Sequence, residues 1–434
     1  MRTIKNYVRA ALPILLGCLL FVACSDDDIA EKGVKEGLPA SLTFKMVVPD
    51  LNDAVVTRAG VEQETALNQL MFLFYKKSDT SKPAFAKVID QLGSWRIGSD
   101  GNDNSNRLYT VTISPGETDL NDNELMSGEY YLYALANWGN GFCSYDAEGY
   151  ASKSLDELKS AILARESSAN VLDIINNTPM TGIYGRDDGS IEIYEGENSF
   201  GNTDETRVHL RRAVAKVIFN ISTVDGITFT PERYSIYHYS QSSTLMERSG
   251  WGGDQGTKPG NLSYEGNNSF SDYEDLAYSD STPTSFEFYM PETVQRAKDS
   301  NFTDVKMREK RESETNEKFK YAPEKSTYIV IEGHYNGPRN ASSDETAIYD
   351  GDVKYTIQLG DFDATRGGID NFTIRRNVKY TYNVKVKGVN NIITEASAEN
   401  FDAEPQPGAE GDLVRMDDGT IKLDLDAHFE RVLL

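Results

Sequence analysis

The sequence of 434 residues has few of the side chains on which most catalytic and metal sites depend, with 3 Cys and 4 His. It contains no HExxH zinc motif, no Cys pair with zinc spacing, no GxSxG nucleophile elbow and no Walker loop. Acidic residues are so abundant that a carboxylate pair for glycoside hydrolysis can be neither located nor excluded. The sequence therefore favours a protein that is not an enzyme and needs no metal or cofactor, with a surface hydrolase as an alternative.

Basic residues are also scarce, since 44 Lys and Arg stand against 68 Asp and Glu, for a net charge of −24. Such a balance argues against a nucleic acid partner. If the N-terminal leader is removed, Cys24 and Cys143 are the only cysteines left, which excludes an intrachain disulfide framework.

The N-terminus has the pattern of a signal peptide, because three basic residues precede an apolar run over residues 10–23. A membrane-spanning helix needs about 20 apolar residues, so this run is too short. Residues 20–23 before Cys24 resemble the lipobox of bacterial lipoproteins, which implies that Cys24 is acylated and becomes the mature N-terminus. Cys18 is the alternative, but cleavage there would leave the apolar residues 19–23 on the mature protein. Residues 25–28, a serine followed by three aspartates, resemble the acidic tag that directs lipoproteins of Bacteroidetes to the outer surface.

The composition favours β-sheet, because Tyr (24) outnumbers Phe (18) and turn-forming residues are plentiful. Apolar and polar side chains alternate over residues 42–48, before Pro49, which predicts a strand with one buried face. Strands are also predicted at residues 70–75, 108–113 and 129–137. The last of these is apolar on both faces, so it should be central in its sheet.

One helix is predicted in the first half of the chain, because Ser154 and Glu157 have the spacing of a capping box. Leu155, Leu158 and Ile162 should then line one face of this helix. Residues 183–194 predict a hairpin with Asp188 and Gly189 in its turn.

A polar stretch, residues 195–205, is interpreted as the separator between two domains, because an apolar run over 208–219 opens a second strand-rich block. Two long polar insertions, 241–284 and 292–324, interrupt this block, and loops of that length are usually functional or mobile. The strands of the second block are predicted at 234–239, 285–290, 327–335, 353–359 and 378–387. The predicted organisation is a signal peptide (1–23), a lipidated polar leader (24–40), two β domains (41–205 and 206–401) and a C-terminal segment (402–434).

The C-terminal segment starts with a linker rich in Pro and Gly, residues 402–412, and ends in one more strand candidate. Charged residues occupy one face of this strand. A linker of eleven residues spans up to about 36 to 40 Å when extended, so the strand can reach beyond its own domain. It can equally complete its own sandwich. The apolar face consists of Ile421, Leu423, Leu425, Ala427 and Phe429.

Five short motifs, spread in order over residues 41–390, resemble the fimbrillin superfamily of Bacteroidetes, of the FimA and Mfa types. The more specific two are LRRAVAKV and the pair Arg376 and Asn377 with the strand that follows. The full set is Thr57-Arg58-Ala59, GEYYLYALAN (128–137), PMTG (179–182), LRRAVAKV (210–217), and Arg376-Asn377 with residues 380–388.

The resemblance implies a mainly β chain of two tandem transthyretin-like β-sandwiches, with a short helix in the first and an extended C-terminal strand. It also implies a structural subunit of a fimbria, or pilus, that serves cell adhesion and has other fimbrial subunits as partners. In the family, an Arg-specific protease cuts the loop after the first strand, and a partner's C-terminal strand replaces that strand. Here the cut would fall between Arg58 and Ala59, strand 42–48 would leave, and the donor would present Ile421, Leu423, Leu425 and Phe429. The lipid anchor would place the precursor on the outer membrane at the cell surface.

The sequence leaves other interpretations open. The family also contains anchors and tip adhesins, and the long insertions of the second block suit a surface lipoprotein that binds glycans or proteins of host or bacterial surfaces without polymerising. Trp251, in a glycine-rich loop, could stack on a sugar ring or simply anchor that loop. Arg58 could be an ordinary loop residue.

Overall fold

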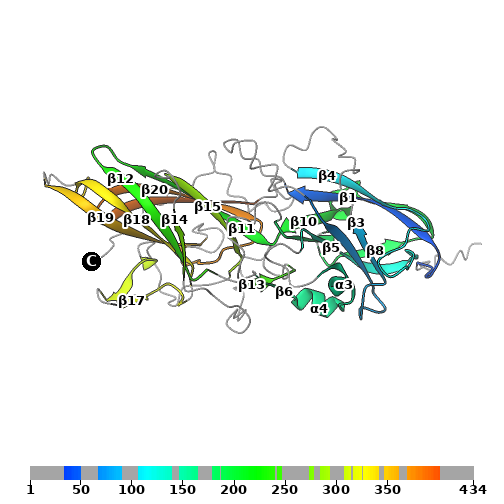
Figure 1. The fold of residues 1–434 in the computed structure, drawn as a ribbon. Coiled ribbons are helices and arrows are strands. Elements are labelled where there is room, and N and C mark those ends of the chain that lie inside the picture. The colour runs from blue at the N-terminus through cyan, green and yellow to red at the C-terminus, as the bar shows by residue number, and fades with distance from the viewer. Residues whose placement is uncertain are drawn as a thin grey trace, which may run out of the picture.

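The structure is a computed structural model with two β-rich halves joined along the chain (Figure 1). It describes the following residues: 34–49, 67–89, 106–138, 146–164, 178–185, 187–239, 242–246, 273–277, 284–293, 307–313, 316–324, 326–341, 347–360 and 369–400. No helix in these ranges is long and apolar enough to cross a membrane.

The first half is one nine-stranded sheet that curls around a single core. Because alternate side chains of a strand point to opposite faces, one face of each strand lines this core. Phe44 of the first strand meets Phe72 of the second edge to face, with ring centroids 5.0 Å apart, so distant parts of the sheet close on each other. The main path of the sheet runs β3 (Phe85–Ile89), β2 (Leu70–Lys76), β5 (Gly128–Ala136), β7 (Met180–Tyr184), β10 (Val208–Arg212), β1 (Ala40–Pro49) and β4 (Asn106–Ile113). β8 (Ser190–Ile193) pairs with β5, and β9 (Gly196–Ser199) pairs with β1.

The four strands predicted in this half are present as β1, β2, β4 and β5. β5 lies between β2 and β7, which confirms that the strand with two apolar faces is central. The prediction of a hairpin over 183–194 is wrong. β7 and β8 both run antiparallel to β5, one after the other along the same edge, so they do not pair with each other. A turn does occur at Asp187 and Asp188, but the chain continues after it along the same edge of β5, and Gly189 O accepts a hydrogen bond from Leu132 N (2.8 Å).

Two short helices, α3 (Ala147–Ala151) and α4 (Leu155–Ser160), cover the outer face of this sheet. The predicted capping box is confirmed, since Glu157 N donates to Ser154 Oγ (3.2 Å) and Ser154 N donates to Glu157 Oε2 (2.8 Å). The prediction that Ile162 extends the helical face is wrong. The backbone leaves the helix at Ala161, and Ile162 belongs to β6 (Ile162–Ala164).

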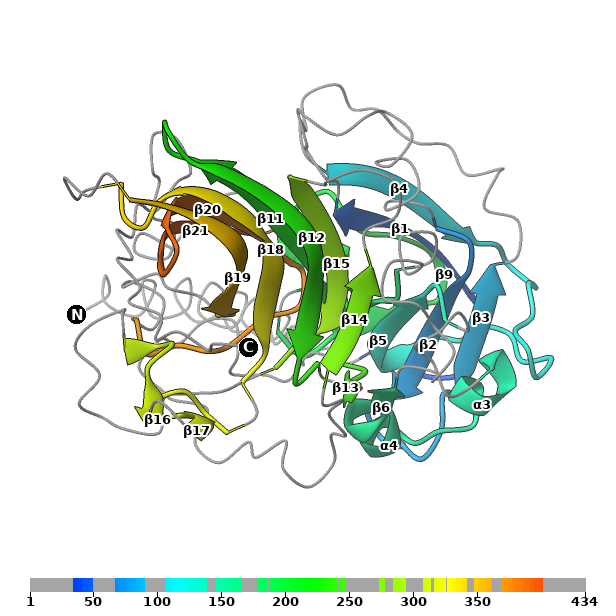
Figure 2. The same cartoon turned by 60° about the vertical axis from the view of Figure 1, so that its left-hand side comes forward.

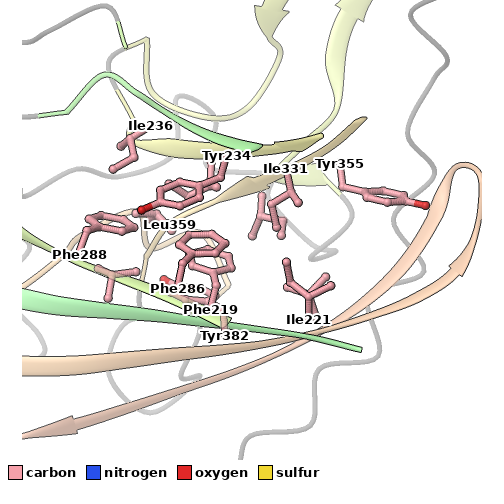
Figure 3. Packing of buried hydrophobic residues seen from close by; sticks show 14 of the residues in the cluster. Phe219, Ile221, Tyr234, Ile236, Phe286, Phe288, Ile331, Tyr355, Leu359 and Tyr382 are labelled. Carbon is pink, nitrogen blue, oxygen red and sulfur yellow. The ribbon is translucent and has the colours of Figure 1, made fainter. Parts of the chain in front are cut away.

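The second half is a sandwich of two four-stranded sheets that share one core. The rings of Tyr382, Phe219, Phe286 and Tyr234 stack in succession across it, with centroid distances of 4.8, 4.9 and 3.7 Å (Figure 3). One sheet consists of β15 (Ser285–Pro291), β11 (Val214–Thr223), β20 (Val378–Gly388) and β21 (Asn391–Asn400). The other consists of β14 (Tyr273–Ala277), β12 (Thr228–Tyr237), β18 (Tyr328–Pro338) and β19 (Ile348–Gln358).

All five strands predicted for the second block are found here, as β12, β15, β18, β19 and β20. The predicted fold class, a mainly β chain with β-sandwich architecture, is therefore confirmed. The polar insertions also contain strands, because β13 (Ser242–Thr244) and β14 lie in the first, and β16 (Arg311–Ser313) and β17 (Asn316–Phe319) form a hairpin in the second.

The apolar run over 208–219 divides between the two halves. β10 pairs with β1 and β7 of the first sheet, whereas β11 opens the second sandwich. Sheet membership thus changes at Ala213, several residues after the proposed boundary at 205.

The two halves are tied together by residues 242–246, which we call the junction strap. Its strand β13 pairs with β6 of the first half, and Leu245 N donates to Ala161 O (2.8 Å). From the second half, the buried Arg376 side chain donates from Nη1 to Leu245 O (2.8 Å) and also pairs with buried Glu292. Arg376 belongs to the motif that suggested the family resemblance, and its position at the junction gives that motif a structural role.

Candidate functional site

β1 supplies a complete apolar face to the first core. Ala40, Leu42, Phe44, Met46 and Val48 alternate along it, and all are buried. Burial of a large apolar side chain is worth about 1.5 to 3 kcal/mol, so the four larger residues contribute roughly 6 to 12 kcal/mol together. A chain without β1 would have to fill this place with another apolar strand.

β1 is bordered by strands on both edges (Figure 2), and we call β1 with these neighbours the β1 site. On one edge, residues 42–49 pair antiparallel with residues 113–106 of β4. On the other edge, residues 40–43 pair in parallel with β9, and Met46 and Val47 pair in parallel with Val208 and His209 of β10. Among the strands that the structure describes, β4 has β1 as its one strand partner. Any strand in this place therefore forms main-chain hydrogen bonds on both sides.

The backbone ahead of β1 is held by Ser127, which is fully buried. Ser127 N donates to Leu38 O (2.7 Å), and its hydroxyl donates to Lys35 O (2.6 Å). Gly37 N in turn donates to Ser127 O (3.0 Å). These bonds fix where the chain enters the β1 site.

Tyr130 supports this entry point from β5. Its hydroxyl donates to Met126 O (2.9 Å), next to Ser127. Burial, with a smaller contribution from the charge of Glu36, raises the pKa of Tyr130 to about 12. The phenol therefore stays protonated and keeps donating across the physiological pH range.

Asn198 of β9 clamps the first half of β1 from the other edge. Its Nδ2 donates to Ser41 O (3.1 Å), and its Oδ1 accepts from Tyr194 N (2.8 Å). The sequence does not indicate this contact, because the polar residues 195–205 predict only a separator between domains. A single Asn in a polar stretch carries no signal that it bonds to a strand more than 150 positions earlier.

The residues that the sequence singles out for chemistry lie outside the described ranges, so their roles stay predictions. The described part of the chain brings together the strand expected to leave and its neighbours, and it stops short of the expected cut. The residues outside the described ranges are Cys24 for lipidation, Arg58 and Ala59 for processing, Ile421, Leu423, Leu425 and Phe429 for strand donation, and Trp251 for glycan contact.

The described ranges hold no group of three or more His, Cys, Asp or Glu side chains arranged to bind a metal ion. His209 lies on β10, with Nε2 2.8 Å from Asp204 O, and His334 lies on β18 beside Asp350 and Asp352. Both histidines therefore have hydrogen-bond partners within the fold.

The sequence and the structure were compared with protein-family models, curated proteins and solved structures. A family described as a domain of unknown function, DUF4906, matches residues 288–384, in the second sandwich. No protein of curated function matches the sequence. Among solved structures, the chain is similar to the tip fimbrial protein Mfa3 from Porphyromonas gingivalis, with 15% identity, a TM-score of 0.45, and coverage of 83% of this chain and 99% of that one.

A fimbrilin, FimA, from Porphyromonas gingivalis W83 is similar at 14% identity and a TM-score of 0.46, with coverage of 86% of this chain and 94% of that one. A proposed cell adhesion protein from Parabacteroides distasonis ATCC 8503 is similar at 13% identity and a TM-score of 0.49, with coverage of 84% and 100%. The structural neighbours are Bacteroidetes fimbrillins and cell adhesion proteins. Two of them, Mfa3 and FimA, are of the types that the sequence motifs resemble.

Proposed function

We propose that this protein is a structural, non-enzymatic subunit of a cell-surface fimbria that serves adhesion. It would be exported as a lipoprotein precursor acylated at Cys24 and anchored to the outer membrane. Proteolysis after Arg58 would then allow β1 to leave, and the C-terminal strand of another subunit would take its place.

The observation that carries this proposal is the position of β1. β1 pairs with strands on both edges and contributes a full row of buried side chains to the core. Its downstream covalent link to the rest of the sheet is the segment 50–66, which contains Arg58. Cleavage in this segment would leave β1 held by non-covalent contacts alone. Strand exchange could then proceed with the remaining strands still joined through the chain.

The sequence contains a replacement with the same pattern. β1 buries five alternating residues, and residues 421–429 offer five apolar residues at the same spacing of two. Main-chain hydrogen bonds would supply affinity and the alternating side chains would supply fit, as in other cases of strand addition. This correspondence supports residues 421–429 as the donor.

Residues 401–434, which include the C-terminal segment, follow a strand that ends near the junction between the two halves. Asn400, the last residue of β21, pairs with Val378, which follows Arg376 and Asn377 at the junction between the two halves. Residues 401–420 span up to about 66 to 72 Å when extended. The donor can therefore reach a β1 site well outside its own sandwich.

A test is to change the charge on each face of the C-terminal strand separately. The double substitution Leu423→Asp and Leu425→Asp would bury carboxylates in the partner's core and should abolish polymers. The matched control, Asp424→Asn with Asp426→Asn, alters the other face at the same positions in the strand and should leave polymers intact. Polymer yield is read on an unboiled detergent gel of material sheared from cells.

Unchanged polymers from the Leu423 and Leu425 variant would contradict strand donation by this segment. If the wild-type chain forms no polymer at all, the alternative applies, in which it is a resident surface lipoprotein acting as anchor, tip adhesin or glycan-binding module. In that case Trp251→Ala is the substitution to examine for loss of glycan binding.

A further inference from the structure

β9 and β10 lie along the same edge of β1, but strand pairing is interrupted between them. β9 accompanies residues 40–43, and β10 resumes the pairing at Met46. Residues 200–207, which we call the bracket, connect the two strands. The bracket starts with a main-chain contact to β1, because Phe200 N donates to Thr43 O (2.8 Å).

The bracket is ordered by its own hydrogen bonds. Thr206 Oγ1 accepts from Gly201 N (3.1 Å) and donates to Thr203 O (2.9 Å). Arg207 Nε donates to Gly201 O (3.1 Å). Gly201 is thus held from both its N–H and its carbonyl group, which leaves it little freedom to move away from β1.

Gly201 contacts β1 more closely than any other residue type could. A Cβ atom at Gly201 would lie 2.5 Å from Lys45 Cβ and 2.7 Å from Lys45 N. Gly201 also has a φ of +104°, in the region that favours glycine. Gly196, at the start of β9, has a φ of +82° but nothing within 4 Å of the equivalent Cβ position. Alanine at either position would strain the backbone, but only alanine at Gly201 would also collide with β1. A comparison of the two variants therefore distinguishes the two effects.

We infer that the bracket retains β1 and selects the strand that occupies the β1 site. This inference rests on the proposed function, and it adds an element that controls the exchange. At the position of Lys45, a side chain branched at Cβ would meet Gly201, whereas an unbranched one can extend past it. β1 carries β-branched residues at Thr43 and Val47 on its outer face, but an unbranched lysine at the contact itself.

The proposed donor satisfies the same restriction. Its outer face has no β-branched residue at any position, so every register of residues 421–429 would pass the bracket. These outer residues are Lys422, Asp424, Asp426, His428 and Glu430.

The test is hydrogen–deuterium exchange of the uncleaved full chain, with Gly201→Ala compared with Gly196→Ala. Because the new methyl group collides with β1 only in the first variant, the amides of residues 42–48 should exchange about tenfold faster or more in Gly201→Ala than in Gly196→Ala. Equal exchange of β1 in the two variants would overturn the inference.

Two further substitutions, one of them with a matched control, keep the test decisive if Gly201→Ala does not fold. Thr206→Val removes the hydroxyl that holds Gly201 without adding bulk against β1, and it should also speed exchange of residues 42–48. Lys45→Val should do so as well, whereas Lys45→Gln should not. If Thr206→Val and Lys45→Val both exchange like the wild-type chain, the bracket has no role in retention. Exchange is measured before any cleavage, so a failure of polymer formation leaves this result intact and the two proposals fail separately.

Discussion

Glu309 shows how a single buried residue can make this fold sensitive to pH. The carboxylate is buried in the second half, where Oε1 accepts from Gln358 N (3.2 Å). Burial raises the pKa of Glu309 to about 7, against an opposing effect of the neighbouring Arg308. The Arg308 guanidinium donates hydrogen bonds to carbonyl groups, from Nη1 to Asn371 O (2.9 Å) and from Nη2 to Leu359 O (2.9 Å).

A pKa raised in the folded state means that folding favours the protonated acid. Stability from this group is therefore complete below its ordinary pKa of 4.5 and is lost as the pH rises through about 7. Between pH 5 and pH 8, the free energy of unfolding should fall by on the order of 3 kcal/mol from this residue. Glu309→Gln should remove that fall in urea titrations across the range. Glu312→Gln, on an exposed neighbour, is the control, and the same pH dependence in both variants would refute this role for Glu309.

At the scale of elements, the sequence predicted best those strands whose pattern is local. Alternation over 42–48 and a doubly apolar run over 129–137 identify β1 and β5, because each pattern directly reflects which faces are buried. The capping box at Ser154 likewise needs only residues three apart. The path of the chain between β7 and β8 could not be predicted, because Asp188 and Gly189 favour a turn whether the chain reverses afterwards or continues. β9 and the bracket were missed for the same reason, since their contacts to β1 depend on the path of the sheet.

In the β1 site too, local patterns could be predicted from the sequence and distant contacts could not. The sequence identified the strand expected to leave and the alternation of its proposed replacement. It could not indicate Ser127, Asn198 or Gly201, because each acts through a backbone contact with a distant segment. A polar or small residue in a loop has the same sequence signature whether it clamps a strand or faces water.

The junction strap should depend on Arg376. Arg376→Met would leave Glu292 buried without its ionic partner and would remove the donor to Leu245 O, and breaking a buried pair in this way typically costs about 3 to 5 kcal/mol. We expect a lower melting temperature and faster hydrogen exchange in residues 242–246 and 162–164. Arg375→Met changes a neighbouring, partly exposed residue and should have little effect. If Arg376→Met leaves exchange in the strap unchanged, the buried pair does not hold the two halves together.

At the scale of the whole molecule, cleavage of one peptide bond, between Arg58 and Ala59, would convert the precursor into a subunit that can polymerise. Arg58→Ala should abolish polymers while export and surface display continue, because β1 would remain covalently attached and the β1 site would stay filled. Surface labelling of intact cells checks export, and the detergent gel checks polymers. Polymers of normal length from Arg58→Ala would contradict the assigned cleavage site.

The most direct test of cleavage and strand exchange is N-terminal sequencing of each band from an unboiled detergent gel of material sheared from cells. We predict a ladder of polymers whose subunits begin at Ala59 and therefore lack β1. Polymers whose subunits begin at acylated Cys24 and retain β1 would contradict the account.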